Sequence, residues 1–371
     1  VCRQSPCMDT DLDRNAGMKV FTSRQGDIYL GNIGDGLQKA IQSLEPSLVV
    51  ILADDNTVLH CVPFVESLAE SDIPPIVIAS GDQHKTLDSC ETIWSALVQS
   101  GADRASLLLH VGGGMICDLG GFAAACYQRG IRFAHVPTSL LAMADAAMGG
   151  KTGINFGGYK NYIGRFEAPA FIWTDPIFLK TLPRQEILDG LAEITKHAII
   201  GSRDLWERVS SIERLDAIDW YTLLELNIPV KIHISDLDPF EKGLRKTLNF
   251  GHTIGHALES HFLHSAQPLS HGQAVTLGML GETKLAHLTG MLGNEDFRSI
   301  IDLILRLLSP CEVTLPTIDV LRPWLLGDKK KSGGRVGYSL PDSIGTCKWD
   351  IRVEEEHVME SLDWVNQVRK G

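Results

Sequence analysis

The segment 244–259 carries four polar side chains at intervals of three or four residues: Arg245, Asn249, His252 and His256. Residues three and four apart lie on one face of an α-helix, so the spacing predicts a helix that presents these groups together. Two histidines four residues apart are also a familiar spacing for ligands of a divalent metal. The alternative is an amphipathic helix with hydrogen-bonded core histidines. Four polar groups on one face favour a functional site.

A second polar cluster is expected in a helix from Pro183 to about Ile200, because proline suits a first helical turn. Glu193 and Lys196 are three residues apart there, and His197 is adjacent. A surface ion pair would explain the first two residues. Apolar neighbours of Glu193 favour partial burial instead, and a buried carboxylate near histidines is a candidate metal ligand.

A glycine-rich segment follows the apolar run 107–111. Three glycines occupy positions 112–114, Asp118 comes next, and Gly120 and Gly121 follow on an expected helix. Backbone without Cβ atoms allows a diphosphate to approach amide groups at the end of a strand. The spacing differs from the common Gly-x-Gly-x-x-Gly pattern, so a tight structural turn is the alternative.

Two other segments carry polar groups that suit a ribose or an anion. Asp54 and Asn56 directly follow an apolar run, where a polar side chain can meet a cofactor ribose, although ordinary turn residues look the same. Glycines precede Lys151 in the segment 149–151, with Asp145 upstream and Lys160 and Asn161 downstream. Lysines beside glycines in a loop can hold a phosphate or carboxylate. A solvated loop is the alternative.

Apolar runs that alternate with helix-like stretches predict a parallel α/β sheet in the first half of the chain. The expected strands are residues 48–53, 75–79, 107–111 and 133–137. A helix is expected over 86–99, where the apolar stripe consists of Ile93, Trp94, Leu97 and Val98.

Long helical patterns dominate from about residue 183 onward. The expected division is a loose extension over 1–17, an α/β domain over 18–180 and a mostly helical domain over 181–371. The lysines and glycines of 327–334 predict a mobile basic loop, and a plain solvated charge run is the alternative.

Composition narrows the class of protein. A chain of 371 residues exceeds the usual size of one hydrophobic core, and its 44% apolar and 22% charged residues are ordinary for a globular enzyme. A net charge of −12 argues against nucleic acid as a partner. The sequence has no apolar run of membrane-spanning length. Residues 1–17 are polar and charged, so a secretory signal is not expected there. Eight cysteines without a Cys-x-x-Cys pair indicate free thiols and a cytoplasmic location.

Together these residues resemble the 3-dehydroquinate synthase family from about Asp54 to Gly345. Each motif alone is weak, but their order and spacing together are highly specific. The matching segments are 112–122, 127–130, 137–145, 149–152, 160–161, 190–196, 245–256, 271–272 and 328–330.

The resemblance implies a Rossmann-like, NAD-binding α/β domain followed by a helical metal- and substrate-binding domain. It implies a lyase that converts 3-deoxy-D-arabino-heptulosonate 7-phosphate to 3-dehydroquinate and phosphate, in the shikimate pathway. Oxidation of a ring alcohol by NAD acidifies the adjacent C–H, so phosphate is eliminated, with the substrate's own phosphate as base. Re-reduction, ring opening and an intramolecular aldol closure follow. The family also implies a homodimer.

By similarity, zinc, with cobalt as an alternative, would be held by Glu193, His252 and His271, which gives His256 a substrate-binding role. The substrate would be bound by Lys151, Asn161, Lys196, Lys231, Arg245, Asn249, His256 and one lysine of the basic run, which is Lys329, Lys330 or Lys331. Arg129 would reach the phosphate across a subunit interface. NAD would contact Asp54, Asn56, Asp82, Lys85, Gly113, Gly114, Met115, Asp118, Thr138, Ser139, Asp145, Lys151, Lys160, Thr181, Leu182 and Glu186.

Some positions depart from the family pattern, but none removes a proposed metal ligand or phosphate lysine. Asp82 replaces a glutamate, Ser139 a threonine, Met143 and Ala144 a glutamine and a valine, and Gln273 a glutamate. Three alternatives remain. They are another sugar-phosphate cyclase of the 2-deoxy-scyllo-inosose or epi-valiolone type, a metal-dependent polyol dehydrogenase, and a non-catalytic NAD- or metal-binding module.

Overall fold

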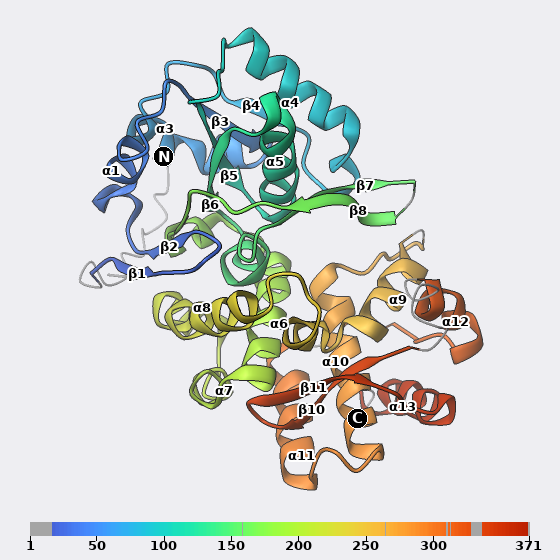
Figure 1. Ribbon diagram of the computed structural model, residues 1–371. Coiled ribbons are helices and arrows are strands. Elements are labelled where there is room, and N and C mark those ends of the chain that lie inside the picture. Colours follow the sequence, from blue (N-terminus) through green and yellow to red (C-terminus); the bar gives the residue numbers. More distant parts are fainter. Residues whose placement is uncertain are drawn as a thin grey trace, which may run out of the picture.

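The computed structural model describes residues 17–157, 159–263, 265–308, 311, 313–327 and 336–369. An α/β body from the first half of the chain lies against a helical body from the second half (Figure 1). Nearly all of the expected extension over 1–17 and of the expected basic loop over 327–334 lies outside the described residues, including Lys329 and Lys330.

A seven-stranded sheet forms the centre of the first body, in the order β1-β2-β9-β6-β5-β3-β4. Only the β1–β2 pair is antiparallel among these strands, which confirms the predicted parallel α/β sheet. The strands are β1 Lys19–Phe21, β2 Asp27–Leu30, β3 Val49–Asp54, β4 Ile76–Ile78, β5 Leu107–Gly112, β6 Arg132–Pro137 and β9 Phe171–Thr174. Sequence reasoning predicted β3, β4, β5 and β6. It missed β1, β2 and β9, because runs of three or four residues carry little periodic signal.

Helices cover both faces of the sheet. Alternating strand residues such as Val50 and Leu52 pack under α4 Leu87–Gln99 and α5 Gly114–Cys126. The intervening residues, such as Ile51, belong to a core that continues into the helical body. Helix α4 confirms the prediction over 86–99, with one correction. Val98 is 66% exposed, because the buried stripe runs through Cys90, Ile93 and Leu97.

A two-stranded hairpin replaces the loop expected around Lys151 and Lys160. It consists of β7 Lys151–Phe156 and β8 Tyr159–Phe166, paired antiparallel. The loop prediction was wrong because glycines and lysines are poor strand formers, whereas cross-strand pairing and the packing of β7 on α5 decide the outcome. The hairpin projects from the α/β body along the boundary with the helical body (Figure 1).

The helical body begins with η5 Pro176–Thr181 and α6 Arg184–Gly201, so the predicted helix from Pro183 starts one residue late. Its other helices include α7 Arg203–Ser210, α8 Trp220–Leu237, α9 His252–Phe262, α10 His271–Leu288, α11 Asn294–Leu303, α12 Ile318–Gly327 and α13 Glu355–Val368. A hairpin of β10 Tyr338–Ser343 and β11 Thr346–Ile351 interrupts this helical region. Because packing is continuous across both bodies, the domain division at residue 180 stays a prediction.

The single helix expected over 244–259 is wrong. The segment forms a 3₁₀ helix, η7 Leu244–Asn249, and a separate α9 that starts at His252. Gly251 between them has φ +80°, and its carbonyl lies so close to Gly278 of α10 that a Cβ there would come within 1.9 Å of it. The left-handed conformation at Gly251 therefore breaks the helix and allows α9 to pack closely on α10.

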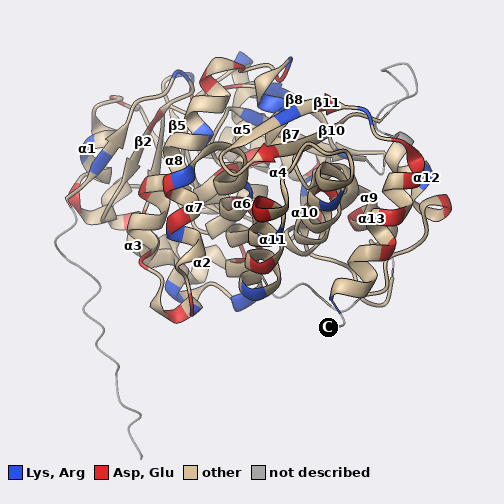
Figure 2. Cartoon of the chain, turned by 90° about the horizontal axis from the view of Figure 1, so that it is seen from below, with Lys and Arg blue, Asp and Glu red and all other residues tan. Residues whose placement is uncertain are grey.

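No described helix is long and apolar enough to span a membrane. Lys and Arg are interspersed with Asp and Glu over the face in Figure 2, without a broad basic surface. An anionic ligand would therefore need a small local cluster of Lys and Arg side chains.

Candidate active site

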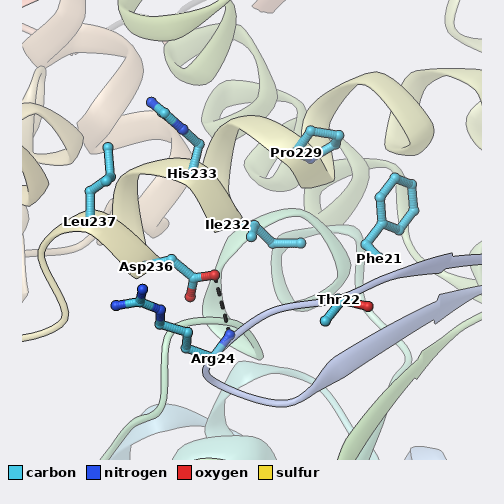
Figure 3. Close-up of a pocket in the computed structure, with 8 residues that line it drawn as sticks. All are labelled: Phe21, Thr22, Arg24, Pro229, Ile232, His233, Asp236 and Leu237. Atoms are coloured by element: carbon cyan, nitrogen blue, oxygen red, sulfur yellow. Dashed lines mark hydrogen bonds between the residues drawn. The ribbon is translucent and has the colours of Figure 1, made fainter.

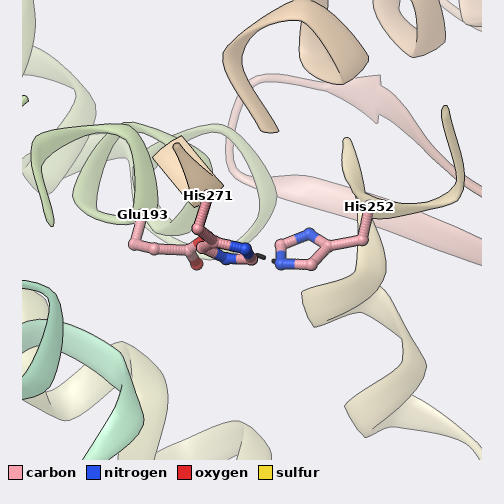
Figure 4. A group of neighbouring side chains, drawn as sticks. All are labelled: Glu193, His252 and His271. Atoms are coloured by element: carbon pink, nitrogen blue, oxygen red, sulfur yellow. Dashed lines mark ion pairs between the residues drawn. The ribbon is translucent and has the colours of Figure 1, made fainter. Parts of the chain in front are cut away.

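Three helices bring together the side chains that were predicted as metal ligands. Glu193 comes from the middle of α6, His252 from the first position of α9 and His271 from the first position of α10. The Nε2 atoms of His252 and His271 lie 3.4 and 3.5 Å from the same atom, Oε1 of Glu193 (Figure 4). One ligand atom from each side chain falls within 4.8 Å of the others.

The chemistry of this cluster fits a divalent metal. Neither carboxylate oxygen of Glu193 has a hydrogen-bond partner among the described residues, although both are buried and Lys196 forms an ion pair with Oε2. His252 Nδ1 lies 3.1 Å from the carbonyl of Phe250, so Nδ1–H can donate there and leave the Nε2 lone pair facing Glu193. Two imidazole nitrogens and one carboxylate, with further positions open, are typical of a catalytic zinc site.

The charge states of Glu193 and His252 also suit metal binding. Burial raises the pKa of Glu193, but Lys196 and His252 outweigh it and hold the pKa below its ordinary value. Burial, with Lys196 nearby, keeps the pKa of His252 well below its usual range. For His271 burial also acts downward, yet the nearby carboxylates of Glu193 and Glu259 outweigh it and raise the pKa to about 10. The cluster thus offers an ionised carboxylate and a neutral His252.

Asp145 organises a second cluster beside the first. It lies in a π-helical turn, η4 Ala142–Ala146, and accepts hydrogen bonds from Lys231 Nζ at 2.6 Å and His197 Nε2 at 3.1 Å. Asn227 orients His197 through Nδ1 at 2.9 Å and donates to the Ala144 carbonyl. Burial lowers the pKa of Lys231 to about 8, although Asp145 acts in the opposite direction.

Arg245 and Lys151 extend this polar region. The buried Arg245 side chain donates through Nη2 to the Gly149 carbonyl at 3.0 Å, and its Nε has no partner among the described groups. Gly149 has φ +93°, and a Cβ there would lie 2.4 Å from Nη2 of Arg245, so the predicted glycine cluster serves this contact. Lys151 forms an ion pair with Glu241, which also accepts from Asn249 at 2.9 Å.

Four charged residues that were predicted to contact NAD lie close together in the structure. Lys85 is buried and lies 3.0 Å from Asp118 and 3.4 Å from Asp82. Lys160 Nζ lies 3.5 Å from the other oxygen of Asp82 and 2.7 Å from Glu259 on α9. Burial lowers the pKa of Lys85, but the carboxylates of Asp118 and Asp82 outweigh burial, so the net effect raises this pKa.

The glycine turn at the start of α5 is crowded, as a close approach of backbone requires. A Cβ on Gly113 would lie 3.2 Å from Ser139 Oγ, and one on Gly114 would lie 3.1 Å from Ala146. Thr138 donates its N–H to the Gly112 carbonyl at 3.0 Å. The predicted turn residues 113–115 and 138–139 therefore share one edge of the sheet.

Other predicted residues lie elsewhere or serve local structure. Asp54 Oδ1 accepts from the N–H groups of Asn56 and Thr57, so its carboxylate caps α2 Thr57–His60. Arg129 is exposed after α5, and Asn161 is exposed on β8. His256 lies on α9 with its ring centroid 5.0 Å from that of His252. Thr181 and Leu182 end η5, and Glu186 lies in the first turn of α6.

Sequence reasoning missed three residues in these clusters: Asn227, Glu241 and Glu259. Glu259 could have been found, because it continues the series of His252 and His256 at intervals of four and three residues. Asn227 and Glu241 carry no such periodic signal.

A separate cleft of about 460 Å³ contains none of the predicted residues. It lies between the turn after β1 and the outer face of α8, and Asp236 accepts from the Arg24 N–H at its rim (Figure 3). It is lined by the apolar residues Phe21, Pro229, Ile232 and Leu237 and by four polar or charged residues. The candidate active site is therefore the cluster on α6, α9 and α10 and not this cleft.

Solved structures share this fold over nearly the whole chain. A 2-epi-5-epi-valiolone synthase from Streptomyces hygroscopicus, solved with NAD+ and Zn2+ bound, has a TM-score of 0.82 at 24% identity and covers 94% of this chain and 99% of its own. A 2-deoxy-scyllo-inosose synthase, complexed with carbaglucose-6-phosphate, NAD+ and Co2+, has a TM-score of 0.78 at 23% identity, with 93% and 99% covered. The fold defines the class, which is the dehydroquinate synthase-like fold of a parallel-sheet α/β body joined to a helical body.

Sequence comparison narrows the class to one family. The model of the 3-dehydroquinate synthase N-terminal domain matches residues 75–189, and that of the C-terminal domain matches residues 190–331. The 3-dehydroquinate synthase of Parabacteroides distasonis is 38% identical, over 93% of this chain and 99% of the relative. That of Pyrococcus abyssi is 36% identical, over 88% and 94%. The chain belongs to the 3-dehydroquinate synthase family.

Proposed function

We propose that this chain converts 3-deoxy-D-arabino-heptulosonate 7-phosphate to 3-dehydroquinate and phosphate, with NAD and a divalent metal, zinc or alternatively cobalt. The observation that carries the proposal is the 38% identity with a 3-dehydroquinate synthase over almost the full length of both chains. The convergence of Glu193, His252 and His271 supports it, because a family member needs a metal-competent donor set.

The two bound groups would have separate places and tasks. Glu193, His252 and His271 would hold the metal, and the region of the glycine turn, Lys85 and Lys160 would hold NAD. When bound, the metal supplies a Lewis acid that polarises substrate oxygens, and NAD supplies a reversible hydride acceptor.

The residues of the chain would bind and orient an anionic substrate. Lys231 and Arg245 are buried cations, and Lys196 lies beside the carboxylate of Glu193. Buried cations bind a phosphate or carboxylate strongly because little water screens them. Asp145 and Glu241 balance Lys231 and Lys151 through ion pairs, which keeps these ammonium groups in place. Positioning and charge stabilisation would thus be the main work of the protein.

Phosphate release from purified, metal-loaded protein with NAD tests the reaction. We expect phosphate and 3-dehydroquinate from the heptulosonate 7-phosphate, with no net NADH. A hexose 6-phosphate and a heptulose 7-phosphate without a carboxylate should give little phosphate, because they leave one buried cation unpaired. Turnover of only these two sugars would move the function to a sister cyclase, and net NADH would indicate a polyol dehydrogenase.

The same function includes a homodimer formed through the β7–β8 hairpin. All described residues of β8 are exposed, among them Tyr159, Tyr162 and Phe166, which is unusual for aromatic side chains of a monomer. Arg165 donates to the Ala125 carbonyl at 3.3 Å and so ties the hairpin to the end of α5, just before Arg129. Arg129 would then reach the substrate of the partner subunit. Light scattering should give twice the mass of one chain, whereas the mass of one chain would exclude this role.

A cytoplasmic location is part of the proposal. The free cysteines among the described residues include Cys61, Cys90 and Cys117, and burial raises the pKa of each thiol, which suits unreactive core residues in a reducing compartment.

A further inference from the structure

Glu259 touches both the metal cluster and the cofactor side, yet it belongs to neither predicted set. It lies on α9, two turns after His252, and only 8% of its surface is exposed. Its two carboxylate oxygens have different partners. Oε1 accepts from Lys160 Nζ at 2.7 Å, and Oε2 lies 3.7 Å from His271 Nδ1.

His271 is therefore held between two carboxylates. Its Nε2 faces Glu193 Oε1 at 3.5 Å and its Nδ1 faces Glu259. When a carboxylate faces one ring nitrogen of a metal-binding histidine, it fixes the tautomer and the ring orientation and makes the other nitrogen a better donor. Glu259 occupies that place for His271, as the Phe250 carbonyl does for His252.

Lys160 carries this contact into the α/β body. It projects from β8, and besides Glu259 it pairs with Asp82, which pairs with Lys85 and through it with Asp118. A line of alternating charges thus runs from His271 to the helix that follows the glycine turn. Lys160, Asp82, Lys85 and Asp118 are all residues for which a contact with NAD is expected.

A second possibility is that Glu259 is itself a metal ligand, since His256, Glu259 and His271 also form a compact group. Partner contacts argue against this. His256 of that group is exposed, and Glu259 Oε1 already accepts a hydrogen bond from Lys160. Glu193 is fully buried, although Lys196 forms an ion pair with one of its oxygens. Both oxygens of Glu193, in contrast, lack hydrogen-bond partners among the described groups, and two imidazole Nε2 atoms converge on one of them.

We propose that Glu259 is a positioning residue that holds His271 toward the metal and links it to Lys160, so that the metal and NAD each strengthen binding of the other. Metal on Nε2 of His271 fixes the ring that faces Glu259, and an ordered Glu259 fixes Lys160 before NAD arrives. The second ligand then orders fewer groups than it would alone. The inference rests on the proposed function.

The variant Glu259→Gln tests the positioning role, because it keeps the shape and removes the charge. Co2+ titration of the full-length, NAD-free protein, followed by visible absorption, and Zn2+ titration against a chelator give the metal affinities. We expect a loss of about 10- to 100-fold, the range for residues that orient metal ligands, with an altered Co2+ spectrum. Glu360→Gln, which removes a surface ion pair with Lys284, is the control and should change neither.

The link to NAD is measured as the ratio of NAD dissociation constants without and with Zn2+. Wild-type protein should show a ratio of about 5 or more, since coupling between sites is commonly 5- to 150-fold. In Glu259→Gln the ratio should fall toward 1. Lys160→Gln should also lower it, while changing metal affinity without NAD by less than about 3-fold, because Glu259 still faces His271.

Unchanged metal affinity in a folded Glu259→Gln protein overturns the positioning role, as does an equal loss in Lys160→Gln. A coupling ratio that Glu259→Gln leaves unchanged overturns the link. If Glu259→Gln does not fold, Lys160→Gln alone decides the link. Failure of the wild-type protein to bind metal would contradict the proposed function itself and is visible in the first titration.

Discussion

At the scale of single residues, each candidate metal ligand directs one donor atom toward the cluster, and a neighbouring group holds the rest of the side chain in place. His252 is restrained by the Phe250 carbonyl, and Glu193 presents oxygens without hydrogen-bond partners among the described residues. The cations beside them are buried and already paired with carboxylates. Charges that are paired in this way are already oriented before a substrate binds, which favours stabilisation of charge in the transition state.

Replacement of His271 by Ala removes one of the three proposed metal ligands. We expect at least about a 100-fold loss of Zn2+ affinity, more than the loss of a residue that only orients a ligand, together with loss of phosphate release. Chelator competition and a phosphate assay measure the two effects. His261→Ala, on the same helix as His252, is the matched control. Full activity of the His271 variant would refute the ligand assignment.

The depressed pKa of Lys231 predicts an alkaline limit of activity. Its pKa is about 8, so at a lower pH the ammonium is charged and attracts an anionic substrate, and at a higher pH the charge is lost. We expect kcat/KM to fall above about pH 8. Lys231→Arg keeps its charge at all these pH values, so its decline should begin at higher pH even if its maximum is lower. An identical alkaline limb would show that another group sets the limit.

At the scale of elements, the start of α9 is set by its contact with α10. The N–H groups of Gly251 and Ile254 donate to the buried Glu282 of α10 at 2.7 and 2.9 Å, which satisfies the first turn and fixes where His252 lies. Close packing through Gly251 and Gly278 holds the two helices together. Both histidines of the proposed metal site are thus first residues of helices that pack closely on each other.

Gly251→Ala should damage both the fold and the site. Its φ of +80° strains any residue with a Cβ, and the new methyl would lie 2.6 Å from Met279 Cγ. We expect a loss of about 2–4 kcal/mol in the free energy of unfolding and weaker metal binding, measured by denaturant unfolding and Zn2+ titration. Gly290→Ala has a similar φ of +72° with open space around it, so it should cost about 1–2 kcal/mol and leave metal affinity unchanged. Equal effects of the two variants would contradict this account.

Two neighbouring strands contain a buried histidine pair, with His110 of β5 opposite His135 of β6 and their Nδ1 atoms 2.9 Å apart. Burial lowers the pKa of His135 to about 3 and that of His110 well below its ordinary value. The unfolded chain takes up these protons below about pH 6.5 while the folded chain does not, so stability falls as pH drops from about 6.5 toward 3.

Replacement of His135 by Gln should make the protein less sensitive to acid. The slope of unfolding free energy against pH, between pH 6.5 and 4, should decrease by up to about 1.4 kcal/mol per pH unit, the contribution of one proton. Denaturant unfolding at several pH values measures it, with the exposed His60→Gln as control. A slope equal to that of the wild type would mean that other groups cause the acid sensitivity.

At the scale of the whole molecule, a continuous apolar core and a line of ion pairs connect the two bodies. The core includes η4 residues such as Met143 and Ala144 together with Leu191 and Ile194 of α6. The ion pairs cross from β8 to α9 through Lys160 and Glu259. We therefore expect binding on one side to affect binding on the other, and the exposed hairpin is the surface that we propose for a second subunit.

Mixing two inactive variants tests the exchange of Arg129 between subunits. In a mixed dimer of Arg129→Ala and His271→Ala chains, one of the two sites has both an intact metal centre and an intact partner arginine. Equimolar, dissociated and reassociated variants should recover about a quarter of wild-type activity, because half of the dimers are mixed. Recovery requires both chains, so each variant reassociated alone is the control. No recovery would place Arg129 in the site of its own subunit or outside any site.

The sequence by itself determined the alternation of strands and helices from residue 48 to 137 and the helix that carries Glu193, and it predicted Glu193, His252 and His271 as metal ligands. These signals are local periodicities and ordered motifs, which survive without knowledge of the fold. It did not predict the short strands β1, β2 and β9, the β7–β8 hairpin or the break at Gly251. Each of these depends on a partner distant in sequence, such as α5 for β7 and Gly278 for Gly251.

Only the tertiary structure decided which polar groups meet. Glu193, His252 and His271 come from three helices, and the contacts of Asn227 with His197, of Glu241 with Lys151 and of Glu259 with His271 and Lys160 have no local signal. Spacing along one helix can predict a shared face, but the choice between a ligand and a residue that orients it depends on what the other helices bring to that face.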